Sequence, residues 1–207
     1  MRISISKRFV FLSNPRCGSE SIRRLLTPYS DILSTKEKPF HHHSNAVTVR
    51  NALRRLGFDW EEFTRFTTFR NPWARAVSFW SYAEKNPASV WHRRLAEAAD
   101  FDAFCALIPP GSSIDRFAGH AGQLIVPEVF RLEDLEQAYP AVASKIGIPT
   151  PRKDGPRGWL ETPRVVLPHI NGAANGDPYQ AYFSPRSRTL IAERFAADIE
   201  LGGYQFD

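Results

Sequence analysis

The feature that most restricts the fold of this chain is a buried strand followed by a polar turn and an amphipathic helix, a pattern that occurs three times. The expected strands span residues 8–13, 65–69 and 126–132, and each precedes a segment with apolar residues at helical spacing. Strands that alternate with helices are typical of α/β proteins with a parallel sheet. We therefore predict an α/β fold with a central parallel sheet flanked by helices, in a single domain over residues 1–207.

Capping and breaking residues predict where the elements begin and end. SESIRRLL (19–26) has helical spacing, and side chains suited to accept first-turn amides precede three further helices. These expected N-caps are Ser44 or Asn45, Asn71 and Ser184. Pro140 is expected to break or kink a helix over residues 134–146, and Pro127 favours a sheet edge or a strand start. Residues 149–178 are rich in Pro, Gly and Arg and predict a long surface loop.

Composition excludes several classes of protein. With 207 residues, 43% of them apolar, the chain has enough apolar surface for a core, which excludes an intrinsically disordered protein. The longest apolar runs, such as FVFL at 9–12, are far shorter than a membrane span requires. The basic N-terminal segment has too short an apolar run for a secretory signal, so we expect a cytoplasmic protein. Two cysteines make neither a metal site nor a disulfide framework.

Arginine dominates the positive charge. The formal net charge is +5, and 21 of the 27 basic residues are arginines. The planar guanidinium group binds phosphate or sulfate oxygens in two places at once, so a ligand with several anionic groups would suit this chain. A GC-rich genome, which enriches Arg and Ala together, explains the bulk excess equally well. The basic residues form no continuous run, and no nucleic-acid partner is predicted.

The loop after the first strand, NPRCGSES (14–21), has the composition of an anion site. Gly18 permits a tight turn, and the amides at the start of the next helix point toward the space beyond it. Ser19 and Ser21 add hydroxyl groups, and Arg16 adds a full positive charge. An ordinary strand-to-helix turn with a surface arginine has the same pattern. The glycine and lysine spacing of a Walker loop is absent.

A second polar segment, FRNPWARAVSFW (69–80), follows the second strand. Arg70 ends the strand, and Ser78 lies about two turns into the next helix. Ligands of parallel α/β sheets bind at the carboxyl ends of the strands. Arg70 and Ser78 are therefore candidate ligand-binding residues when they are considered together with the first loop, although a polar helix face is usually only exposed to solvent.

Several of these motifs resemble those of sulfotransferases that use 3′-phosphoadenosine 5′-phosphosulfate (PAPS). P-R-C-G-S-x-S (15–21) is similar to their phosphosulfate-binding loop, and F-R-N-P-W-x-R-x-V-S (69–78) is similar to their 3′-phosphate motif. The resemblance continues, in the family's order, through F-R-L-E-D-L (130–135), L-P-H-I-N (167–171) and the C-terminal segment 184–206. The carbohydrate-type branch, with its small bacterial members, is the most similar. The fold that this resemblance implies is the P-loop-like nucleotide-binding sulfotransferase fold.

The resemblance assigns roles to matching residues. Arg16 stands where the family has lysine, and it would contact the 5′-phosphosulfate and stabilise the leaving phosphate. The remaining loop residues would bind the same group: Cys17, Gly18, Ser19, Glu20 and Ser21. Arg70 and Ser78 would bind the 3′-phosphate. His169 and Asn171 lie in the long loop, where related enzymes close over the nucleotide.

Three consecutive histidines between the two motifs supply candidate bases. H-S-N-A (43–46) resembles the family's H-x-x-A, so His43 is the predicted general base, with His41 and His42 in reserve. Glu20 is a further candidate. The three histidines are also compatible with a metal-binding tract or with solvated loop residues.

The sequence thus predicts transfer of a sulfuryl group from PAPS to a hydroxyl or amine of a small-molecule or carbohydrate acceptor, without a metal ion. Two alternatives stay open: a nucleotide or small-metabolite kinase, and a non-catalytic protein that binds adenosine 3′,5′-bisphosphate. Neither the acceptor nor the oligomeric state follows from the sequence.

Overall fold

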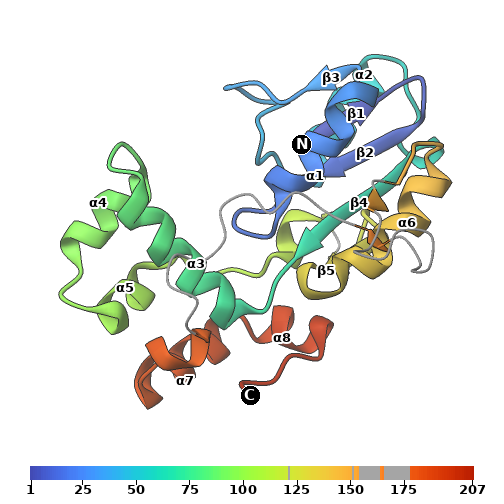
Figure 1. The fold of residues 1–207 in the computed structure, drawn as a ribbon. Helices are drawn as coiled ribbons and strands as arrows, with labels where there is room; N and C mark the ends of the chain where they lie inside the picture. The colour runs from blue at the N-terminus through green and yellow to red at the C-terminus, as the bar shows by residue number, and fades with distance from the viewer. Residues whose placement is uncertain (121, 151, 154–163, 166–177) are drawn as a thin grey trace. The chain divides into compact units, whose positions relative to one another are not determined.

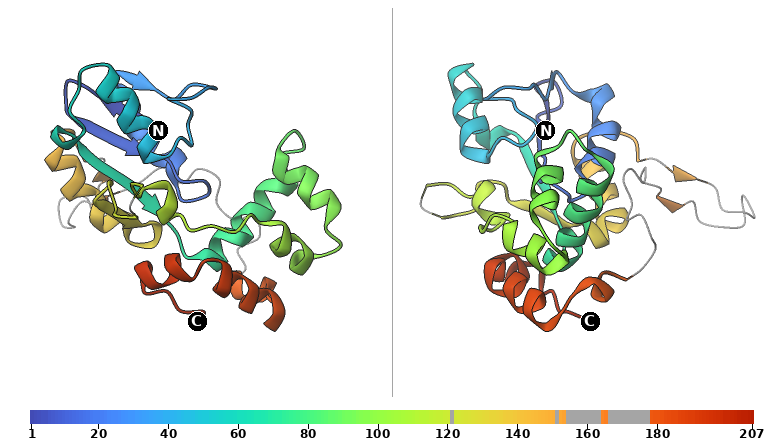
Figure 2. Two further views of the ribbon diagram at one scale, coloured as in Figure 1. Left: turned by 180° about the vertical axis from the view of Figure 1, so that it is seen from behind. Right: turned by 90° about the vertical axis from the view of Figure 1, so that its left-hand side faces the viewer.

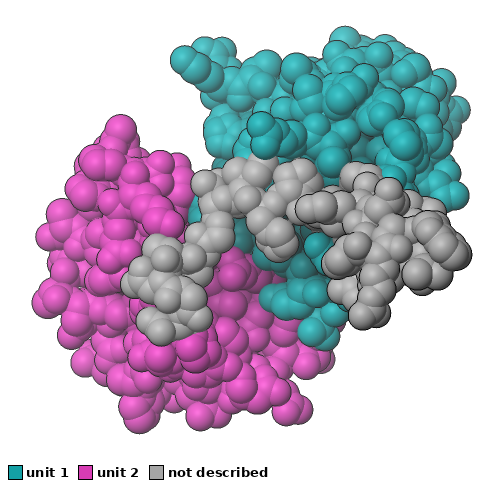
Figure 3. Space-filling model, in the orientation of Figure 1, with its two compact units in different colours: residues 1–69, 116–170 teal, residues 70–115, 171–207 magenta. Residues whose placement is uncertain are grey.

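The computed structural model describes residues 1–120, 122–150, 152–153, 164–165 and 178–207. The chain forms two compact units that are interleaved along the sequence (Figure 3). Unit 1 comprises Met1–Phe69 and Arg116–Ile170, and unit 2 comprises Arg70–Asp115 and Asn171–Asp207.

Unit 1 contains a five-stranded sheet in the order β3-β1-β2-β4-β5 (Figure 1). The three predicted strands form its parallel part, since β2 pairs with β4 and β4 pairs with β5 in parallel. Two short strands that the sequence did not predict extend this part at one side, and both β1–β2 and β1–β3 are antiparallel. The strands are β1 (Arg2–Ser4), β2 (Phe9–Leu12), β3 (Ile32–Leu33), β4 (Thr64–Phe69) and β5 (Glu128–Arg131).

Helices cover both faces of this sheet because the side chains of β2 alternate between them. Phe9 and Phe11 pack with α1 (Ser19–Leu26) and α6 (Leu135–Lys145), where Ile22 and Tyr139 belong to the same buried cluster. Val10 and Leu12 face the opposite way and pack with α2 (Ala46–Arg55) and the fully buried Trp60. The α/β fold with a central sheet flanked by helices is therefore confirmed.

The predicted helix boundaries of unit 1 are also confirmed. α1 covers residues 19–26, and α2 begins after Asn45, whose side chain accepts a hydrogen bond of 2.8 Å from the amide of Thr48. β5 lies at the sheet edge, as Pro127 indicated. α6 runs through Pro140 as one helix, so the proline does not break it.

The described part of unit 2 consists of helices and turns. Its helices are α3 (Pro72–Lys85), α4 (Val90–Glu97), α5 (Phe101–Leu107), α7 (Pro185–Arg194) and α8 (Ala196–Gly202). α4, α5 and α7 all contact α3 (Figure 2). Aromatic rings fill these contacts: Trp80 meets Phe104 edge to face at 5.2 Å, and Phe79 meets Trp91 at 4.0 Å between ring centroids.

The remaining elements are short. A two-stranded antiparallel pair, β6 (Arg152–Lys153) and β7 (Arg164–Val165), lies in the segment predicted as a loop, most of which is outside the described residues. The 3-10 helices are η1 (Thr27–Tyr29), η2 (Trp60–Glu62), η3 (Ile114–Arg116), η4 (Leu132–Asp134) and η5 (Tyr179–Tyr182). No helix in the described ranges has both the length and the apolar character needed to cross a bilayer.

Candidate functional site

The loop between β2 and α1 makes a tight turn through two residues with left-handed backbone conformation. Arg16 has φ 62° and Gly18 has φ 71°, and the amide of Cys17 donates to the carbonyl of Asn14 at 3.3 Å. A non-glycine residue rarely adopts this conformation, so the backbone at Arg16 is strained. Such strain is often found at functional sites, and here it lies at the residue that the sequence predicts to bind an anion.

Gly18 is required by both its conformation and its surroundings. A Cβ atom added at this position would lie 2.3 Å from Cδ1 of Leu132, in addition to the cost of the positive φ. Gly18 is also the N-cap of α1, and it provides no side chain to cap the helix. The loop backbone therefore approaches Leu132 closely, and the N-cap residue of α1 supplies no side-chain acceptor to the first-turn amides.

Side chains buried beneath the loop hold its shape. The Ser19 hydroxyl donates to the carbonyl of Asn14 at 2.8 Å and accepts from the amide of Asn14 at 3.0 Å. From the neighbouring strand, the Thr68 hydroxyl donates to the carbonyl of Cys17 at 2.6 Å. The Cys17 side chain is fully buried, with its thiol 3.4 Å from the carbonyl of Pro15. The side chains of Ser19 and Thr68 thus hold the backbone of the loop in its turn.

The helix start above this loop has the electrostatics of an anion site. The amides of Ser19, Glu20 and Ser21 in the first turn of α1 have no acceptor one turn earlier within the helix. Their partial positive charges add to the helix dipole and to the charge of the half-buried Arg16. Glu20 opposes them only in part, because its half-exposed carboxylate forms an ion pair with Arg23.

His43, the predicted base, lies directly against the start of this loop. Its Nδ1 donates to the carbonyl of Ser13 at 3.3 Å, since a carbonyl oxygen only accepts. The proton of the neutral imidazole is therefore on Nδ1, and Nε2 carries the lone pair. The arrangement is the one that a general base requires.

The three histidine rings lie next to one another. The ring centroids are 4.0 Å apart for His41 and His42, and 4.3 Å apart for His42 and His43. Burial, together with the charges of His42 and Arg116, lowers the pKa of His43 to about 3, against the opposing effect of the hydrogen bond to Ser13. Burial, His41 and Arg23 lower the pKa of His42 to about 4. Both rings are therefore neutral at neutral pH.

Arg116, which the sequence did not single out, holds the backbone of His43. Its guanidinium donates to the carbonyl of His43 from a position 73 residues later in the chain. A lone arginine at the end of η3 carries no sequence signal for such a contact. The structure therefore adds Arg116 to the residues that determine the position and charge of His43.

The second predicted motif lies in unit 2. The half-buried Arg70 directly follows the last residue of β4, and Ser78 is buried on α3. Between them, Asn71 caps α3 by accepting hydrogen bonds from the amides of Trp73 at 3.0 Å and Ala74 at 3.2 Å. The predicted cap and the placement of Arg70 at a strand end are confirmed, while the ligand roles of Arg70 and Ser78 stay predictions.

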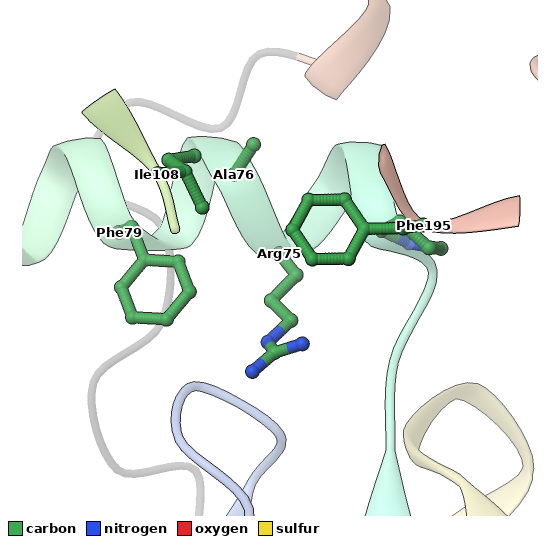
Figure 4. Close-up of a pocket in the computed structure, with 6 residues that line it drawn as sticks. Arg75, Ala76, Phe79, Ile108 and Phe195 are labelled. Atoms are coloured by element: carbon green, nitrogen blue, oxygen red, sulfur yellow. The ribbon is translucent and has the colours of Figure 1, made fainter. Parts of the chain in front are cut away.

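Arg75, on the same helix, takes part in a buried polar network. Its Nη1 donates to the Ser113 hydroxyl at 2.8 Å and lies 3.8 Å from a carboxylate oxygen of Asp198, a residue with 1% of its surface exposed. Arg75 also lines a pocket that is otherwise apolar, where Figure 4 shows Phe79 and Phe195 on either side of it. The pocket is lined by Pro72, Arg75, Ala76, Phe79, Ile108 and Phe195, and no predicted site residue is among them.

Two other predictions have limited structural outcomes. His169 and Asn171 lie outside the described residues. Within the part of the chain that the structure describes, no group of three or more His, Cys, Asp or Glu side chains is arranged to hold a metal ion.

Comparisons with known proteins identify the fold. No protein-family model matches the chain, and no curated protein matches it. Among solved structures, a mouse sulfotransferase, SULT7A1 complexed with PAP, matches with a TM-score of 0.53 and 15% sequence identity. The match covers 95% of this chain and 86% of that one. The chain therefore has the α/β fold of a sulfotransferase.

Proposed function

We propose that this protein is a PAPS-dependent sulfotransferase that transfers a sulfuryl group to a hydroxyl or amine of an acceptor. The observation that carries the proposal is the position of His43, whose ring is held against Ser13 at the start of the strained, glycine-capped loop before α1. The candidate base and the candidate anion-binding loop thus lie next to each other in unit 1. The fold shared with a PAP-bound sulfotransferase supports the same function.

The residues of the loop fit an anionic sulfate donor. A Cβ at Gly18 would meet Leu132, so this position of the loop has no room for a side chain. The amides of Ser19, Glu20 and Ser21 start α1, three positions after the charged Arg16. These groups would hold the 5′-phosphosulfate. When PAPS is bound, it supplies the sulfuryl group, and its phosphate is the leaving group. Arg16 would stabilise negative charge on that phosphate, since charge stabilisation dominates catalysis of such displacements.

His43 acts on the acceptor. Its Nε2 takes the proton of the acceptor hydroxyl, while Nδ1–H stays bonded to the Ser13 carbonyl and keeps the ring oriented. The low pKa of His43 guarantees the neutral form that accepts a proton. An anion bound at the adjacent loop would raise that pKa, because a nearby negative charge favours imidazolium. Donor binding would therefore make His43 a stronger base.

The proposal is tested by nucleotide binding, measured by calorimetry with adenosine 3′,5′-bisphosphate and with ATP. Arg70→Ala should weaken bisphosphate binding by about 1.5–3 kcal/mol, because it removes a charge-assisted contact to phosphate. Arg93→Ala, an exposed arginine on α4, is the matched control and should change little. Preference for ATP would instead favour a kinase, and unchanged affinity in the Arg70 variant would remove the predicted 3′-phosphate contact.

Turnover is tested separately with radiolabelled PAPS and a panel of sugar, phenol and peptide acceptors. His43→Ala should lower turnover by about 10²–10⁴-fold and leave bisphosphate binding nearly unchanged. Tight bisphosphate binding without any sulfated product would indicate a non-catalytic binding protein. Loss of activity on changing His41 or His42, but not His43, would show that the base is misassigned.

A further inference from the structure

Two arginines from different elements of unit 1 lie close together beside the histidines. Arg2 is in β1, and Arg23 is in α1, one turn beyond the loop. Arg2 Nε donates to the Thr27 hydroxyl at 2.9 Å, and that hydroxyl donates to the carbonyl of Arg23 at 2.6 Å. A single threonine thus joins both residues.

Their positive charges are poorly balanced by the chain. Arg2 Nη1 donates to the carbonyl of Met1 at 2.8 Å and to the Ser34 hydroxyl at 3.2 Å, both neutral acceptors, and Arg2 forms no ion pair with a described residue. Arg23 pairs with Glu20 through Nη2, but its buried Nε has no hydrogen-bond partner among the described residues. One carboxylate therefore serves two guanidinium groups.

The positive charge of Arg23 also acts on one of the histidines, His42, which precedes the candidate base His43. Arg23 helps to lower the pKa of His42, and Glu20 is the one acidic group that acts in the opposite direction there. The ring of His42 is 4.3 Å from that of His43 between centroids. The positive excess therefore lies next to the residue that would deprotonate the acceptor, and Arg23 is one turn further along α1 than the amides that would hold the donor.

We propose that Arg2 and Arg23 form a subsite for an anionic group, a carboxylate or a sulfate, carried by the acceptor. The inference rests on the proposed function, because it uses His43 to locate the acceptor. An acceptor anion would supply the negative charge that the chain lacks, and guanidinium groups bind carboxylate and sulfate oxygens through paired hydrogen bonds. The substrate class is thus an acidic acceptor, such as a uronate-containing or already sulfated sugar.

The test compares three probes by calorimetry in the absence of nucleotide. They are a uronate-containing tetrasaccharide, the same sugar with its carboxyl groups reduced to alcohols, and its carboxyl-reduced, sulfated form. At least one anionic probe should bind about tenfold or more tightly than the neutral sugar, and the better anion identifies the source of the charge. Equal binding of all three, or binding of none, would overturn the subsite.

Variants then assign the preference to the two arginines. Arg23→Gln and Arg2→Gln should each reduce the preference to less than threefold. Arg24→Gln changes the same charge at the next, exposed position of α1 and should keep it. Glu20→Gln should strengthen binding of the anionic probe, because it releases Arg23 from its ion pair, and loss of folding does not produce that result.

Nucleotide binding separates this proposal from the proposed function. Arg23→Gln should leave the affinity for adenosine 3′,5′-bisphosphate within about twofold. If it weakens the nucleotide and spares the sugar, the arginines belong to the donor site and the subsite is refuted. If the unaltered protein binds the acidic sugar but no nucleotide, the proposed function fails while the anion subsite stands.

Discussion

Gly18 shows how one position can be determined by two separate physical demands. Its φ of 71° disfavours any residue with a Cβ, and the 2.3 Å approach to Leu132 leaves no space for that atom. Gly57 has a similar φ of 85°, but a Cβ added there would have no atom within 4 Å. Both glycines therefore have a backbone conformation that disfavours a Cβ, but only Gly18 also lacks the space for one.

Gly57→Ala should cost about 1–2 kcal/mol in the free energy of unfolding, because alanine is strained in the left-handed conformation. Gly18→Ala should cost at least about 2 kcal/mol more, since the loop or Leu132 must move. Urea unfolding monitored by circular dichroism measures both. Adding Leu132→Ala to Gly18→Ala should remove part of the difference; equal costs for the two single variants would show that Leu132 yields without resistance.

The buried His43 makes a prediction about acid stability. Its pKa of about 3 in the folded protein lies below the ordinary 6.5, so between these values the unfolded chain binds a proton that the folded protein does not. Stability due to this group is therefore present above pH 6.5 and is lost as the pH falls toward 3. His43→Gln should flatten the pH dependence of unfolding by about 1 kcal/mol per pH unit in this window. An unchanged slope in denaturant titrations would refute the burial of the ring.

At the scale of elements, helix caps connect local sequence to local structure. The Asn71 side chain accepts two amide hydrogen bonds at the start of α3, and Pro72 occupies the first helical position. Asn71→Ala should therefore cost about 1 kcal/mol in unfolding free energy, with a lower melting temperature by calorimetry. Asn71→Ser keeps an acceptor and should recover most of this loss. Equal melting temperatures for all three proteins would contradict the cap.

Elements with strong local signals could be predicted from the sequence, whereas elements set by tertiary contacts could not. α2, α3 and α7 carry caps, α1 carries apolar spacing, and β2 and β4 carry aromatic or β-branched runs. β1 and β3 have three and two residues, too few for a period to be visible, and their pairing depends on the sheet. α8 follows α7 directly at Phe195, so the sequence predicted one helix there instead of two.

Within the candidate site, too, some residues could be predicted from the sequence and others could not. The loop before α1 and the histidines were predicted because glycine, serine, arginine and histidine have distinctive chemistry at those places. The contact of Arg116 with His43 spans 73 residues, and the link from Arg2 through Thr27 to Arg23 depends on how β1 meets α1. Such contacts arise from folding across long separations, and no short pattern encodes them.

At the scale of the whole molecule, the chain passes between its units at residues 69–70, 115–116 and 170–171. The single domain predicted from the sequence stays a prediction. Within unit 2, Asp198 joins segments far apart in the sequence: it accepts hydrogen bonds from the amide of Ser113 at 2.8 and 2.9 Å and lies near Arg75. This carboxylate has 1% of its surface exposed.

Asp198→Ala should cost about 3 kcal/mol or more in unfolding free energy, because it leaves buried amides without their acceptor and removes the carboxylate that balances the charge of Arg75. Arg75→Ala should cost less, since Asp198 keeps its amide donors. Thermal and urea unfolding of both variants give the comparison. A larger cost for Arg75→Ala would show that the ion pair, and not the amide contacts, dominates the network.

The carboxylate of Asp198 also links local opening of the backbone at Ser113 to the C-terminal helices of unit 2. Solvent deuterium reaches the amide of Ser113 only after that contact breaks, and Asp198 is in α8, 85 residues away. The exchange rate of this one amide is therefore expected to follow the breaking of its contact with α8.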